Sequence, residues 1–177
     1  MAQKRAIFED ADQSALLGVC EGDSEFIPVW LMMRCGMHPC DVSTAGKKVK
    51  FDGKYISWKR AKNSYPRHEL VPEYLRERMS AWLKRGRKLC RNGYWHLVSR
   101  VGSRIGHPEY SPQTLRHTFG TQMLKYYMSQ PKPPPDVFDL VARKMGCSVF
   151  VVKGFYVDLQ DWERAAEDHG NHENTIP

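Results

Sequence analysis

The chain has 177 residues, of which 41% are hydrophobic and 27% charged, a balance typical of a globular protein rather than a disordered or fibrous one. It holds no apolar run of the ~20 residues that a membrane span needs, and no apolar core of a secretory signal at its start. The five cysteines are odd in number and form no CxxC pair, which favours a reducing compartment over a disulfide scaffold.

The first part of the chain predicts helices. The spacing of apolar residues indicates one helix over 7–21 and a second over 23–33, with Asp23 or Ser24 as its cap. A glycine and a proline then end the pattern, so only a short helix or turn fits over 38–44.

The pattern changes to alternating apolar and polar residues over 48–60, on both sides of an Asp52-Gly53 pair. Asp-Gly between alternating runs is a strong hairpin signal, and it predicts φ > 0 at both turn positions. A third strand is expected over 67–71, after a loop that holds Lys62. These runs predict a small three-stranded antiparallel sheet.

Most of the remainder is predicted to be helical. Ser111 and Pro112 indicate an N-cap and the first helical position, and the proline-rich run at 131–135 indicates an extended loop. The segment 148–157 is short and apolar. The expected helices span 73–88, 94–105, 112–127, 136–146 and 159–167. The fold class is therefore mainly α with a small three-stranded antiparallel β-sheet (α+β), as a single domain over 1–167 and a flexible tail over 168–177.

Positive charge is concentrated in the middle of the chain. The net charge is +7, and residues 47–106 hold 17 lysines and arginines against four acids, a balance of +13, so the flanks carry −6. A basic middle between acidic flanks is typical of a surface that binds a polyanion. A solvated basic surface explains the charge alone equally well.

Three local signatures follow one another. In the first, the strand ISWKR leads to a loop lysine. In the second, SPQTLRHTFGT opens a helix that carries Arg116. The third, MGCSVFVVKGFYVD, begins at the end of a helix and continues through a short apolar segment to Tyr156. In this order the chain resembles the catalytic domain of the tyrosine recombinases, the phage-integrase family, over about residues 8–160. The family's Leu-Gly-His-Ser box sets its histidine nine positions before the nucleophilic tyrosine, and Cys147 lies nine positions before Tyr156.

The resemblance implies a role for each matching position. Tyr156 matches the nucleophile, Arg116 the second arginine of the family signature, and Lys62 the lysine of the sheet. Lys59 or Arg60 could serve in place of Lys62, since all three lie in one basic segment.

Other positions depart from the family pattern. His38 stands in the place of the first arginine, Gln113 in the place of a histidine, and Cys147 in the place of the later histidine or tryptophan. We hypothesise that Arg34, one helical turn before His38, supplies the missing guanidinium charge, or that His38 acts as a weaker cation. His117 is expected to brace the site. The departures leave two alternatives open: a catalytically impaired DNA-binding relative, and a plain basic nucleic-acid-binding module.

The implied reaction needs these residue types. A tyrosine hydroxyl, whose usual pKa is ~10, becomes a nucleophile only beside cations or a base. Arginine neutralises the charge that builds on the phosphate, and a lysine protonates the leaving 5′-oxygen. The resemblance implies site-specific breaking and rejoining of DNA through a 3′-phosphotyrosine, with no cofactor. No metal site is expected, because no standard zinc spacing joins Cys35, His38, Cys40 and Cys90.

The resemblance also implies partners. The expected partner is double-stranded DNA, on which the protein assembles as a homo-oligomer, a tetramer in a synaptic complex or a monomer when alone, in the cytoplasm with the nucleoid. Such proteins serve DNA integration in mobile elements, viruses or plasmids, and their N-terminal DNA-clamping domain is expected to be absent here. DNA contacts are expected from basic residues of the middle segment: Lys59, Arg60, Lys84, Arg85, Arg87, Lys88 and Arg91.

Overall fold

The computed structural model describes residues 10–59, 66–85 and 88–156. The elements follow in the order α1 (Asp10–Gly18), α2 (Asp23–Arg34), α3 (Pro39–Ser43), β1 (Val49–Phe51), β2 (Tyr55–Lys59), β3 (Pro66–Leu70), α4 (Glu73–Lys84), α5 (Arg91–Ser103), α6 (Pro112–Met128), α7 (Val137–Met145) and α8 (Val149–Tyr156). A mainly helical fold with a three-stranded antiparallel sheet is confirmed. The helix expected over 159–167 and the tail lie outside the described residues. Among these helices, each is too short or too polar to cross a lipid bilayer.

Some element boundaries differ from the predictions. α1 ends at Gly18, and α4 ends at Lys84, because the next residue, Arg85, adopts an extended conformation with φ −63° and ψ 122°. α5 begins at Arg91, three residues before its predicted start, after an extended N-cap. The apolar segment after Ser148, for which the sequence predicts no helix, forms α8.

The caps and turns combine confirmed and corrected predictions. Ser111 is the N-cap of α6 and Pro112 takes its first position, as predicted, and the structure adds a capping box between Ser111 and Thr114. α2 is different, because Gly22 with φ 69° is its N-cap and neither Asp23 nor Ser24 takes that place.

The hairpin forms, but its turn lies one residue later than predicted: Phe51 pairs with Ile56 and the Asp52 amide donates to the Tyr55 carbonyl, so the two turn residues are Gly53, with a φ of 96°, and Lys54. The Asp52 carboxylate accepts hydrogen bonds from the amides of Lys54 (2.9 Å) and Tyr55 (2.7 Å). Asp52 is therefore the residue before the turn, where its side chain satisfies these two amides and its backbone needs no positive φ. The strands pair in the order β1-β2-β3, with Trp58 of β2 opposite Arg67 of β3.

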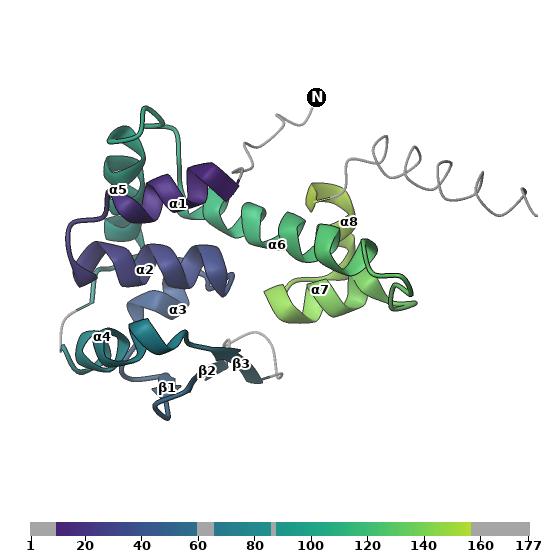
Figure 1. Ribbon diagram of the computed structural model, residues 1–177, viewed down its shortest axis with the longest axis horizontal. Helices are drawn as coiled ribbons and strands as arrows, with labels where there is room; N and C mark the ends of the chain where they lie inside the picture. Colours follow the sequence, from purple (N-terminus) through teal and green to yellow (C-terminus); the bar gives the residue numbers. More distant parts are fainter. Residues whose placement is uncertain (1–9, 60–65, 86–87, 157–177) are drawn as a thin grey trace, which may run out of the picture.

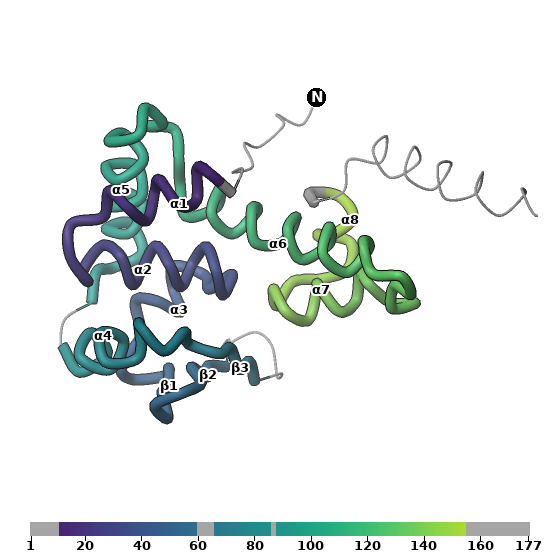
Figure 2. Tube along the Cα trace, in the orientation of Figure 1, coloured from purple at the N-terminus to yellow at the C-terminus, as the bar shows by residue number. Residues whose placement is uncertain are grey.

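Two apolar clusters build the molecule, and α6 joins them (Figure 1, Figure 2). The larger cluster draws on α1 to α5 and the inner face of the sheet, and it reaches α6 at Leu115. The smaller cluster begins one turn later at Phe119 and includes residues of α7 and α8, among them Val141, Met145 and Val152. Figure 1 shows α6 leading from the first group of helices to α7 and α8. The first turns of α6 therefore stand where the two clusters meet.

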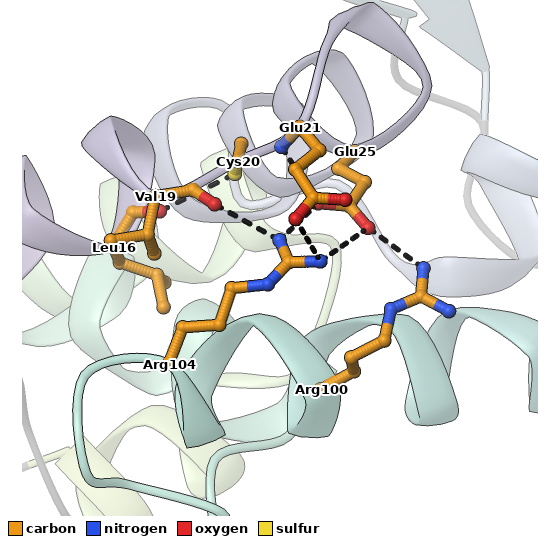
Figure 3. Close-up of polar contacts among 7 residues, drawn as sticks. All are labelled: Leu16, Val19, Cys20, Glu21, Glu25, Arg100 and Arg104. Atoms are coloured by element: carbon orange, nitrogen blue, oxygen red, sulfur yellow. Dashed lines mark hydrogen bonds and ion pairs between the residues drawn. The ribbon is translucent and has the colours of Figure 1, made fainter.

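An ion cluster fastens the corner between α1 and α2 to α5 (Figure 3). The buried Glu25 carboxylate accepts hydrogen bonds from Arg104 (2.5 Å), Arg100 (2.8 Å) and the amide of Glu21 (2.8 Å). Burial alone would raise the pKa of Glu25, but the hydrogen bonds from Arg104, Glu21 and Arg100 outweigh it and hold the pKa below its usual value. Two arginines of the basic middle thus hold the fold together.

Candidate functional site

Arg116 lies at the junction of the two clusters, in the second turn of α6. It is only 5% exposed. Its guanidinium donates through Nη1 to the carbonyl of Gly36, in the loop after α2, and through Nη2 to the carbonyl of Met145, the last residue of α7. One buried cation therefore joins three segments that the sequence singles out: the Gly36 loop, the Leu-Arg-His-Thr helix and the Gly-Cys-Ser turn.

Gln113 and His117 lie one turn apart on α6, with their Nε2 atoms 3.4 Å apart. Gln113 is half-buried. His117, which follows Arg116 in the sequence, is buried. The structure thus brings both predicted residues to the same end of α6 as the arginine. The bracing role of His117 stays a prediction.

His38 has a local structural function that the sequence does not predict. It is the N-cap of α3, and its Nδ1 accepts a hydrogen bond of 3.2 Å from the amide of Cys40. Because Nδ1 serves this cap, any donation from the ring to a phosphate falls to Nε2. Arg34, the alternative source of charge, is the exposed last residue of α2.

The turn after α7 sets the start of α8. Gly146 ends α7 in the left-handed conformation with φ 61°, and the amide of Cys147 donates to the carbonyl of Ala142 at 3.1 Å. Cys147 is half-buried and packs against the smaller cluster. α8 then runs from Val149 to its last residue, Tyr156, and packs on α6 and α7. The backbone of Tyr156 therefore belongs to the packed pair of helices α7 and α8, and the Met145 carbonyl of this pair accepts a hydrogen bond from Arg116.

The predicted cations of the middle segment divide into three groups. Lys62, Arg60 and Arg87 lie outside the described residues. The second group has exposed side chains and consists of Lys59, Lys84, Arg85 and Arg91. Lys84 and Arg85, with Lys47, border a surface hollow of about 370 Å³ between α4 and β1. These exposed cations remain predicted DNA contacts.

Lys88 forms the third group. Its ammonium donates to the carbonyls of Trp82 and Arg85, at 2.5 Å each, and lies 4.3 Å from the centre of the Trp82 ring. Burial, followed by the nearby Arg85 charge, lowers the pKa of Lys88 below its usual value. In this position the ammonium satisfies carbonyls at the end of α4.

The sequence motifs do not point to two charged contacts of β3. Lys144 of α7 and Glu69 of β3 form an ion pair with an Nζ–Oε1 distance of 2.8 Å. Arg67, also of β3, is 6% exposed, and its guanidinium carbon lies 5.7 Å from the centre of the Trp58 ring. The one available signal is the alternation in β3, which turns the charged Arg67 and Glu69 toward the same face as Trp58.

Metal ligands do not gather in the described part of the chain. No group of three or more His, Cys, Asp or Glu side chains there lies close enough together to hold an ion. The chemistry that the described residues offer is that of a buried guanidinium between two backbone carbonyls, next to a helix that ends in a tyrosine.

The fold is similar to that of a tyrosine recombinase catalytic domain. The crystal structure of XerA recombinase matches this fold with a TM-score of 0.68, covering 100% of this chain and 68% of that chain at 13% sequence identity. A segment of 40 residues is 42% identical to tyrosine recombinase XerC of Herpetosiphon aurantiacus. That segment is 23% of this chain and 13% of the XerC chain, and no family model matches the sequence. The two comparisons support the resemblance to tyrosine recombinases.

Proposed function

We propose that this chain is the catalytic domain of a tyrosine-type DNA recombinase, formed as one domain by residues 1–167. The observation that carries the proposal is Arg116, a buried guanidinium at the point where the Gly36 loop and the end of α7 meet. A charged group is costly to bury, and its burial between separate motifs favours a functional cation over a surface arginine. The proteins with which the chain compares are named as recombinases.

The proposed reaction is a transesterification. The Tyr156 hydroxyl gives its proton to solvent, its oxygen attacks a DNA phosphorus, and the new O–P bond forms as the bond to the 5′-oxygen breaks, while Lys62 protonates that oxygen. Arg116 stabilises the charge on the non-bridging oxygens, a contribution of ~3–4 kcal/mol for one well-placed donor. A guanidinium has five N–H donors, so bonds to two carbonyls hold its plane and do not prevent contact with phosphate. Attack by the free 5′-hydroxyl reverses the step and rejoins the strand.

The wider role follows the family. We propose duplex DNA as the partner, a homo-oligomer on paired sites as the working assembly, and DNA integration in a mobile element, virus or plasmid as the biological setting. Exposed Lys59, Lys84, Arg85 and Arg91 supply phosphate contacts that give affinity without sequence preference.

The second candidate is a relative that binds DNA without cleaving it. His38, one of the groups that would stabilise the phosphate, already uses Nδ1 in the cap of α3. Gln113 cannot act as a base, and the thiol of Cys147 is a weak donor. These three positions together favour a slower or silent site, and Arg34 would have to supply the missing charge.

The experiment uses a pool of nicked duplexes of random sequence, which trap a covalent intermediate because the cleaved end diffuses away. We expect an SDS-stable protein–DNA adduct that Tyr156→Phe abolishes and Arg116→Lys reduces by at least ~10²-fold. Tyr126→Phe, at an exposed tyrosine of α6, is the matched control and should behave like the unaltered chain. Duplex binding without any adduct would instead identify the impaired relative. Binding with no preference for duplex would identify a plain basic module.

A further inference from the structure

The two apolar clusters meet across a narrow set of contacts. α7 and α8 pack on each other and on α6, so α6 is their main support. In the described part of the chain, the end of α7 makes two polar contacts: the Met145 carbonyl accepts from Arg116 of α6, which also donates to the Gly36 carbonyl, and Lys144 pairs with Glu69 of β3. Both contacts involve consecutive residues at the last turn of α7.

The Glu69–Lys144 pair is partly withdrawn from solvent. The Glu69 side chain is 22% exposed and that of Lys144 is 35% exposed, with 2.8 Å between the charged atoms. Exposed ion pairs contribute little, but a half-buried pair leaves an incompletely solvated charge when one partner is removed. Removal of one partner should therefore change how α7 sits against the sheet.

Because Lys144 lies just before the turn that leads into α8, a change in the ion pair can move α8. Lys144 precedes Met145 and the left-handed Gly146, and α8 starts three residues beyond that glycine. From Val149 to Tyr156 the helix rises about 10 Å, so a rotation of about 10° at the turn moves its far end by about 2 Å. A misplacement of ~1 Å can cost ~10²-fold in rate when reacting groups must be aligned.

We propose that Glu69 and Lys144 are positioning residues that set where the tyrosine-bearing helix stands relative to Arg116. This inference rests on the proposed function, because the alignment matters for the attack of Tyr156 on a phosphate. The pair acts through the turn after α7 and takes no part in the chemical step. Loss of the pair should slow DNA cleavage, because cleavage depends on the alignment. It should leave DNA binding unchanged, because binding depends on cations elsewhere.

The test compares Glu69→Gln, Lys144→Gln and the exchanged pair Glu69→Lys with Lys144→Glu. The matched control is Arg143→Gln, which breaks a 2.6 Å ion pair with Asp139 within α7 itself. At saturating nicked duplex, we expect each single variant to form the adduct at least about tenfold more slowly, with less than about threefold change in the Kd for duplex DNA. The exchanged pair should recover most of the rate, and the control should match the unaltered chain.

A second readout does not depend on cleavage. Amide hydrogen exchange across α7 and α8 should be faster in both single variants and return toward the original rate in the exchanged pair. If the unaltered chain forms no adduct at all, the proposed function fails, and hydrogen exchange still decides whether the pair holds α7 and α8 in place. Unchanged cleavage with unchanged exchange in the single variants would overturn the positioning role. A parallel loss of DNA binding, or no recovery in the exchanged pair, would also overturn it.

Discussion

Gly36 lies against the ring of Phe119, so closely that a Cβ added to the glycine would stand 2.6 Å from Cε1 of the ring. Gly36 also has φ of +59°, in the left-handed region that favours glycine. Its carbonyl accepts the hydrogen bond from Arg116. The missing side chain thus lets the loop after α2 approach α6 and brings a backbone acceptor to the buried guanidinium.

Gly36→Ala should lower the free energy of unfolding by about 3 kcal/mol, about 1 from the left-handed backbone and about 2 from overpacking against Phe119. Gly106→Ala is the control, because Gly106 has φ +84° but no atom within 4 Å of the place that an added Cβ would take. It should cost only the backbone part, about 1 kcal/mol. Urea unfolding measures both. Equal losses would mean that the close approach to Phe119 has no energetic consequence.

Substitutions at His38 can separate its cap from its proposed role toward phosphate. His38→Asn keeps a side-chain acceptor for the Cys40 amide, so stability should change little, whereas His38→Ala should cost about 1 kcal/mol. If the ring binds phosphate, both variants should slow adduct formation alike. The two measurements are urea unfolding and the nicked-duplex assay.

Arg34→Ala tests the competing source of charge. Loss of cleavage in Arg34→Ala, with normal cleavage in His38→Asn, would assign the missing cation to Arg34. Normal cleavage in Arg34→Ala together with loss in His38→Asn would assign it to His38. Because Arg34 is exposed at the end of α2, its removal should leave the urea midpoint nearly unchanged.

Substitutions of Lys84 and of Lys88 should have different effects, although both residues belong to the basic middle of the chain. Lys84→Gln should weaken duplex binding and reduce the slope of log K against log salt by about 1, as expected for one lost phosphate contact. Lys88→Gln should instead lower the free energy of unfolding by about 1 kcal/mol, because the Arg85 carbonyl loses the ammonium donor and the Trp82 carbonyl keeps only the Arg85 amide. Fluorescence anisotropy at several salt concentrations and urea unfolding check the pair. A reversed outcome would contradict the assignment of Lys88 to the end of α4.

The Glu25 cluster predicts acid sensitivity. The pKa of Glu25 in the folded chain lies below its unfolded value, so its contribution is fully present above about pH 4.3 and is lost as pH falls through the folded pKa. The difference in unfolding free energy between the unaltered chain and Glu25→Gln should therefore shrink as pH is lowered from about 6 to 3. Glu73→Gln, at an exposed position of α4, controls for the loss of one charge. A difference that stays constant over this range would contradict the ionic role.

The local structure could be predicted where the determining hydrogen bonds join residues a few positions apart. Ser111 and Pro112 indicate the start of α6, and the Asp52-Gly53 pair indicates the hairpin, because both act within four residues. Even here, the turn lies at Gly53 and Lys54 instead of Asp52 and Gly53, a shift of one residue that a propensity for turns does not distinguish. The helix α8 was missed because a short apolar run fits a strand or a helix equally well.

The sequence by itself determined the order of the elements as far as α7, the N-cap at Ser111, the presence of the hairpin, and the spacing that places Cys147 nine residues before Tyr156. Only the tertiary structure decided which groups meet across the two clusters. Arg116 reaches a carbonyl 80 residues away at Gly36, and Lys144 reaches Glu69 across 75 residues. The physical reason is that such contacts depend on how whole helices pack, and no local periodicity records which side chain or carbonyl a distant helix will present.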